Sequence, residues 1–320
     1  MPNIPYYDLN NVDPRAQALE NKLVNNSLSP LPTPYISGLK LNADVSINGL
    51  TLNTIDSNNV IWVMSDLQGW WTLPDSEIPD LPRGWGDGSY DAIGRWANRN
   101  ITLTGSFLPQ RPEDATAARN SLIQAISLIK TGGWLVVNES PTRAAYVRLS
   151  GTPEISSVNA KGRHDFSIGL KAVDPIKYEW VDGSSEGYNS VTVAEGATSA
   201  SITNSGNTPV PLVFEISGAL APTVDQPATI INDVTGDTIS LVSSTTSSQR
   251  LEIDTYNREV LLVTGTEPDI TVVNGRSKAA VLIDWMYLAP GVPTTFSFDD
   301  PANGSSTASC KILWRSGWIG

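Results

Sequence analysis

Hydrophobic and polar residues alternate in short runs along most of the chain, which is typical of half-buried β-strands. Before residue 180 the runs cover 39–41, 45–47, 60–64, 101–103, 107, 134–137, 145–149 and 166–172. After residue 190 they cover 201–203, 212–216, 229–231, 238–241, 251–253, 260–263, 270–273, 281–283, 295–298 and 311–314. The later runs are separated by turn-forming residues at intervals of roughly 8–12 residues, which predicts an antiparallel β-sandwich.

One stretch departs from this alternation and has the period of a helix. Residues 111–114 read Arg-Pro-Glu-Asp, which places proline and two acids where a first helical turn favours them. Apolar residues then recur at intervals of three and four positions: Ala118, Leu122, Ile126 and Ile129. Gly132 and Gly133 end the stretch as a left-handed cap would. The sequence therefore predicts one helix whose apolar stripe lies against a sheet, in a mainly-β (α+β) protein.

The distribution of proline, glycine and serine divides the chain. Residues 1–36 contain six prolines and one short helical candidate at 13–24, which indicates an extended N-terminal arm or a disordered terminus. Residues 37–182 hold the helix and the first set of strands. The Gly/Ser-rich stretch at the start of 183–190 predicts a linker. Residues 191–320 are expected to form the β-sandwich.

Composition and charge exclude several classes of protein. The net charge of −12 opposes adhesion to nucleic acid or to an anionic membrane, and 15 acidic against 6 basic residues follow Trp180. Cys310 and His164 are the only cysteine and histidine, so a disulfide within the chain and a Cys/His metal cage are both impossible. The first residues lack the pattern of a secretory signal, and no run approaches 18 apolar residues. We expect a soluble protein made in the cytoplasm.

No arrangement of catalytic residues stands out in the sequence, which predicts that the protein is not an enzyme. A Ser/His/Asp triad would need His164, which lies in an alternating strand with no Gly-x-Ser-x-Gly turn in the chain. We expect His164 on the outer face of that strand. Glu252 and Asp254 share a strand face and could form an acid pair, although surface carboxylates are expected in an acidic protein. No calcium loop or phosphate-binding loop is present in the sequence, and no cofactor or metal is expected.

Tryptophan and arginine are concentrated in one loop region of the first domain. Both residue types are favoured at the centres of protein interfaces, so the region predicts a subunit interface. A small core beneath a long loop and a sugar-stacking platform are the alternatives. The predicted interface residues are Trp70, Trp71, Arg83, Trp85, Asp87, Tyr90, Arg95 and Arg99.

The order of these motifs resembles the phage distal tail proteins, which form the tail-tip hub ring of long-tailed phages with flexible tails. In the first domain the similarity consists of Gly69-Trp70, the loop 86–90, the proline-started helix and a strand that closes with 172–175. In the second domain it consists of 231–236, 251–260, 288–291 and a closing Trp314-Arg315-Trp318. The Pro-rich arm has no match in this pattern.

The resemblance implies a tail-tube-like β-barrel or sandwich domain with one packed helix, which forms a belt around a lumen, and a galectin-like C-terminal domain that projects outward. It implies a structural virion protein, assembled in the host cytoplasm, that forms a homohexameric ring at the distal end of the tail. Its partners would be the tail tube protein, the tail-associated hub protein and other minor tail proteins. Genome DNA would pass through the lumen without specific binding, and no membrane insertion is expected.

Two other functions stay open at this point. The sandwich could be a carbohydrate-binding module that contacts host cell-surface glycans through Trp285, Tyr287 or Trp318. A cell-wall hydrolase with two catalytic acids is the enzymatic alternative, and no pair of acids in the sequence stands out to support it.

Overall fold

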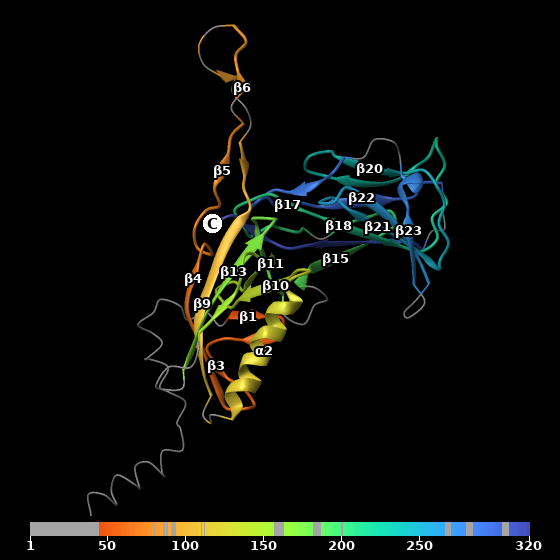
Figure 1. The fold of residues 1–320 in the computed structure, drawn as a ribbon. Coiled ribbons are helices and arrows are strands. Elements are labelled where there is room, and N and C mark those ends of the chain that lie inside the picture. Colours follow the sequence, from red (N-terminus) through yellow and green to blue (C-terminus); the bar gives the residue numbers. More distant parts are fainter. Residues whose placement is uncertain are drawn as a thin grey trace, which may run out of the picture. The chain divides into compact units, whose positions relative to one another are not determined.

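Antiparallel strands form most of the molecule in the computed structural model (Figure 1). The structure describes residues 45–320 except 80, 86, 88, 91–93, 110, 112, 157–162, 182–186, 200, 266–269, 280–283 and 303–306. Within the described chain α2, Asp114–Leu128, is the single α-helix. The prediction of a mainly-β fold with one helix is therefore confirmed.

The first sheet contains eleven strands, eight of them in the order β2-β1-β10-β11-β13-β9-β4-β3. Their bounds are β1 Val45–Ile47, β2 Leu50–Thr51, β3 Thr54–Ile55, β4 Val60–Gln68, β9 Arg99–Pro109, β10 Gly133–Val137, β11 Arg143–Leu149 and β13 His164–Ala172. Three further strands pair with members of this row: β12 Glu154–Ile155, β14 Lys177–Glu179 and β27 Gly317–Trp318. Because buried and exposed positions alternate along β4 and β9, the sheet has one face that packs inward.

The helix covers this sheet with the stripe that its sequence predicts. Ala118, Leu122, Ala125 and Ile126 are buried, and α2 contacts β9 and β2. The side-chain amide of Asn48, in the turn between β1 and β2, donates a 3.2 Å hydrogen bond to the carbonyl oxygen of Ala125. This contact joins the turn to the helix.

The predicted position of His164 is wrong. The side chain is 1% exposed and stacks on Phe107, with ring centroids 4.7 Å apart and planes 9° apart. Side chains two residues apart in a strand lie on the same face, so His164 shares the buried face with Phe166 and Ile168. Its Nδ1 atom lies 3.2 Å from the carbonyl oxygen of Ser156.

The second half of the chain is a β-sandwich of a six-stranded and a four-stranded sheet. The larger sheet has the order β15-β26-β18-β21-β22-β23, with bounds Asn189–Ala194, Ser309–Trp314, Val213–Ser217, Gln249–Asp254, Glu259–Thr264 and Thr271–Asn274. The smaller sheet has the order β16-β25-β19-β20, with bounds Ala197–Thr198, Phe296–Asp299, Ala228–Asn232 and Thr238–Leu241. A short 3-10 helix, η3, covers Arg276–Lys278.

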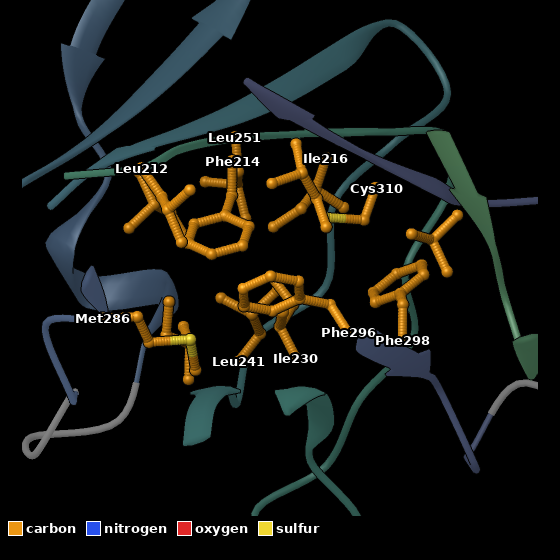
Figure 2. Close-up of a cluster of buried hydrophobic side chains, with 14 of the residues drawn as sticks. Leu212, Phe214, Ile216, Ile230, Leu241, Leu251, Met286, Phe296, Phe298 and Cys310 are labelled. Carbon is orange, nitrogen blue, oxygen red and sulfur yellow. The ribbon is translucent and has the colours of Figure 1, made fainter. Parts of the chain in front are cut away.

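The sandwich core lies between these two sheets (Figure 2). Phe214 of β18 and Phe296 of β25 meet edge to face, with ring centroids 5.8 Å apart. Leu251, Ile230 and Cys310 complete the cluster around them. Burial raises the pKa of the Cys310 thiol, which therefore stays protonated and packs as a small apolar group.

The end of the chain returns to the first sheet, because β27 pairs with β14 in the register Lys177 to Trp318. Strand β17, Val210–Pro211, which precedes β18 in the chain, pairs with β24, Tyr287–Leu288, in a separate two-stranded sheet.

Residues Asp44–Gly320 form one compact unit. The domain limits 1–36, 37–182, 183–190 and 191–320 stay predictions, since residues 1–44 and 182–186 lie outside the described part.

Candidate functional site

The described residues within 71–98 include two short strand pairs that form a narrow β-ribbon, which leaves the first sheet between β4 and β9 (Figure 1). Strand β5, Ser76–Glu77, pairs with β8, Arg95–Trp96, near its base. Further out, β6, Leu81–Pro82, pairs with β7, Ser89–Tyr90. We refer to residues 71–98 as the ribbon.

The ribbon exposes several large apolar side chains. Trp85 is 96% exposed, Ile78 67% and Leu73 59%, while Trp71 and Trp96 are close to half exposed. A two-stranded ribbon has no core of its own and is marginally stable in water by itself. Apolar side chains gathered on such an element are typical of a surface that binds another protein.

The base of the ribbon is fixed by Arg99, the first residue of β9. The side chain is 1% exposed, and burial lowers its pKa to about 10. Its guanidinium donates to five carbonyl oxygens from three parts of the chain: Gly69 at 2.9 Å, Trp70 at 3.2 Å, Thr72 at 2.6 Å, Pro175 at 3.0 Å, and Ile319. Arg99 therefore links the start of the ribbon to the C-terminal end of the chain.

Lys177, in β14, adds a second buried cation beside the first. Its ammonium group donates a 2.9 Å hydrogen bond to the carbonyl oxygen of Trp70 and lies 5.1 Å from the centre of the Trp70 ring. Burial, together with the charge of Arg99, lowers the pKa of Lys177 to about 8. The indole N–H of Trp70 donates to Glu139 at 3.2 Å, and Glu139 pairs with Arg143 at 3.6 Å. This cluster therefore holds Trp70 by its backbone carbonyl, its ring and its indole N–H.

The eight predicted interface residues separate into two groups. Trp70 and Arg99 are buried in the chain's own core, so the prediction that they contact another subunit is wrong for these two. Trp71, Arg83, Trp85, Asp87 and Arg95 are exposed on the ribbon, and their interface role stays a prediction. Tyr90 belongs to β7, and its side chain lies outside the described part.

The three candidate glycan residues do not form an exposed aromatic platform. The Trp318 ring is 9% exposed beneath the guanidinium of Arg143, 4.5 Å away, so its predicted glycan contact is wrong. Trp285 packs partly buried against the sandwich core, with Arg276 5.6 Å from its ring. Tyr287 is 42% exposed, and its role stays a prediction.

Candidate catalytic groups are occupied by structural contacts. Asp254 accepts hydrogen bonds from the backbone N–H groups of Tyr256 and Asn257, at 2.8 and 3.1 Å, and so caps the turn after β21. A carboxylate oxygen of Glu252 lies 3.8 Å from a guanidinium nitrogen of Arg250.

Among the described residues no group of three His, Cys, Asp or Glu side chains is placed to hold a metal ion. The same residues contain no helix with the length and hydrophobicity needed to cross a bilayer.

Comparison with known proteins places this arrangement in a fold family. No family model and no curated protein matches the sequence. The Dit protein of phage SPP1, described as a paradigm of the hub adsorption apparatus in phages that infect Gram-positive bacteria, superposes with a TM-score of 0.56 at 13% identity. The match covers 86% of this chain and 98% of SPP1 Dit. This chain has the fold of a phage distal tail protein.

Two structures of the phage P2 baseplate in its activated conformation, with Ca and with Sr, also match. In both the TM-score is 0.45 at 9% identity, over 85% of this chain and 97% of the other.

The sequence analysis missed Lys177 and Glu139 as parts of the cluster that holds Trp70. A lysine in a strand or a glutamate in a bend is ordinarily solvent-exposed, so neither position carried a signal of these contacts.

Proposed function

We propose that the protein is a structural subunit of a phage tail tip that closes into a homohexameric ring and connects the tail tube to the receptor-binding apparatus. The fold that it shares with SPP1 Dit supports this role. In this proposal the ring passes DNA through its lumen without binding it, and the protein has no catalytic activity. Its location would be the virion.

The observation that carries the proposal is the ribbon. An element without a core of its own that leaves Trp85 96% exposed needs a second surface to cover it. A ribbon that fits on a different surface of an identical neighbour makes a head-to-tail contact, and repeated head-to-tail contacts close into a ring. Arg99 and Lys177 bind the carbonyls of residues 69–72, where the ribbon leaves the sheet, and a closed ring requires the same geometry at this point in every copy.

Imaging of the purified full-length protein tests this proposal. We expect electron-microscopy class averages of rings with six-fold symmetry and an open centre. Rings with another number of subunits would correct the stoichiometry but retain the architecture. Single particles of monomer size at every concentration, together with failure to assemble on purified tail tubes, would overturn the proposal.

A further inference from the structure

A cavity of about 540 Å³ lies between the first sheet and the sandwich, within the unit Asp44–Gly320. One wall comes from β10, β11 and residues 173–178, and the opposite wall comes from the turn after β21 and the strand before it. This volume falls in the range of about 300–1,000 Å³ that small-molecule sites occupy. It is separate from the ribbon.

Aromatic side chains dominate the walls of this cavity. Tyr146 on one wall is 44% exposed and Tyr256 on the other is 50% exposed, so the chain itself covers neither side chain completely. Trp134 lies edge-on to Tyr146, with ring centroids 5.3 Å apart. The guanidinium of Arg315 lies 4.5 Å from the Trp134 ring and 3.8 Å from the ring of Tyr188, so it bridges two of the aromatic side chains that line the cavity.

The polar groups of the cavity are fixed before any ligand arrives. Asp254 accepts from Asn257 Nδ2 at 2.6 Å in addition to its two backbone donors, so the carboxylate has one orientation. Thr255, next to it, donates to the carbonyl oxygen of Leu212 at 2.9 Å and accepts from the Leu212 N–H at 2.8 Å. This two-way contact pins the turn that carries Tyr256 to the sandwich.

The opposite wall is equally constrained. Asp174 accepts a 2.6 Å hydrogen bond from the hydroxyl of Tyr178 and a 3.0 Å bond from the N–H of Ile176. The Tyr146 ring lies against Gly132, where an added Cβ would come within 2.4 Å of the Tyr146 hydroxyl oxygen. A site whose side chains are already ordered binds with a smaller entropic cost.

The charges that line the cavity select the class of ligand. Two carboxylates, of Asp174 and Asp254, stand beside two guanidinium groups, of Arg148 and Arg315, so neither an anion nor a cation is favoured. A purely apolar ligand would displace water from these charged groups and offer no polar contact in its place. A sugar ring matches both features, because its C–H face stacks on tyrosine while its hydroxyls both donate to carboxylates and accept from guanidinium and amide groups.

We propose that this cavity binds a short neutral saccharide, stacked on Tyr256 and Tyr146 and hydrogen-bonded by Asp254, Asn257 and Arg148. The inference does not rest on ring formation. It places saccharide recognition at the junction of the first sheet and the sandwich, away from Trp285, Tyr287 and Trp318.

The test is calorimetric titration of the full-length protein with neutral di- to tetrasaccharides of glucose, galactose, rhamnose and N-acetylglucosamine. We expect saturable binding of at least one of them, accompanied by a change in tryptophan fluorescence from Trp134. Tyr256→Ala should weaken this binding by about tenfold or more. Tyr256→Phe, which keeps the ring and loses the hydroxyl, should weaken it less.

Trp96→Ala is the matched control, because it removes a similarly exposed aromatic ring from the ribbon, and it should bind as the wild type does. No saturable binding of any of these saccharides, or binding that Tyr256→Ala leaves unchanged, would overturn the inference. Binding of a tyrosine- or proline-rich peptide in place of every saccharide would also overturn it. A six-fold ring that binds no saccharide would refute this inference alone, whereas a saccharide-binding monomer that also fails to assemble on purified tail tubes would refute the ring alone.

Discussion

The Nζ atom of Lys177 lies 2.9 Å from the carbonyl oxygen of Trp70 and 5.1 Å from the centre of the Trp70 ring. This places a lysine with 0% exposure beside the buried guanidinium of Arg99. The two cations at the base of the ribbon share the backbone carbonyl of Trp70, and Arg99 also binds the carbonyls of Gly69 and Thr72. The position of the ribbon therefore depends on charges that are costly to bury.

The first prediction follows from the pKa of Lys177, which burial lowers from 10.5 to about 8. Between these two pH values the unfolded chain keeps a proton that the folded chain has lost, so the free energy of unfolding rises with pH. In the Lys177→Met variant this contribution is absent. We expect the stability of the wild type relative to that variant to increase by about 1–3 kcal/mol between pH 7.5 and 10.5 in urea unfolding. A difference that stays constant with pH would contradict the assignment.

The second prediction concerns Arg99 and its five carbonyl partners. Arg99→Ala removes a donor from all five carbonyls, of which Trp70 keeps Lys177, and we expect a loss of about 3–5 kcal/mol in the free energy of unfolding. Arg95→Ala is the matched control, since Arg95 is largely exposed and pairs with Glu77 at the surface. Its unfolding midpoint in urea should stay close to that of the wild type. Equal effects of the two substitutions would show that Arg99 does not anchor the fold.

The third prediction tests the packing of the first sheet at Gly105 in β9. An added Cβ there would lie 2.5 Å from both the Phe166 ring and the carbonyl oxygen of Val63, so Gly105→Ala forces neighbouring strands apart. We expect a loss of about 1–3 kcal/mol in urea unfolding. Gly84→Ala, at a position with nothing within 4 Å, serves as the control and should be neutral.

The fold could be predicted largely from the sequence because its signals are local. The helix was marked by a 3.6-residue period and by acids at its start, and the structure has it at Asp114–Leu128. Strands β18 to β22 were likewise marked by alternation between turn residues. Strand β15, Asn189–Ala194, was missed although Val191 and Val193 alternate with Thr192, because the stretch directly follows the Gly/Ser-rich segment that was assigned to a linker.

The candidate site was less accessible to sequence reasoning, because burial there depends on contacts between distant segments. Arg99 reads as a surface residue until five carbonyl oxygens from residues 69–72, 175 and 319 surround it. The clustering of tryptophan and arginine did locate the right region. It could not separate Trp70, which belongs to the core, from Trp85, which is exposed at the far end of the ribbon.

The fourth prediction is that the ribbon's apolar side chains drive assembly. Ile78→Ser combined with Trp85→Ser removes two of the most exposed of them, and Val224→Ser removes an equally exposed apolar residue from the sandwich half of the chain. We expect the double variant to fold with wild-type stability but to remain a monomer. Val224→Ser should assemble as the wild type does.

Native mass measurement of the wild type and these variants, over a range of concentrations, tests the account most directly. We expect a wild-type species of six times 34.4 kDa that the Ile78→Ser and Trp85→Ser double variant cannot form. A double variant that assembles as completely as the wild type would contradict the role of the ribbon, and with it the basis for the ring.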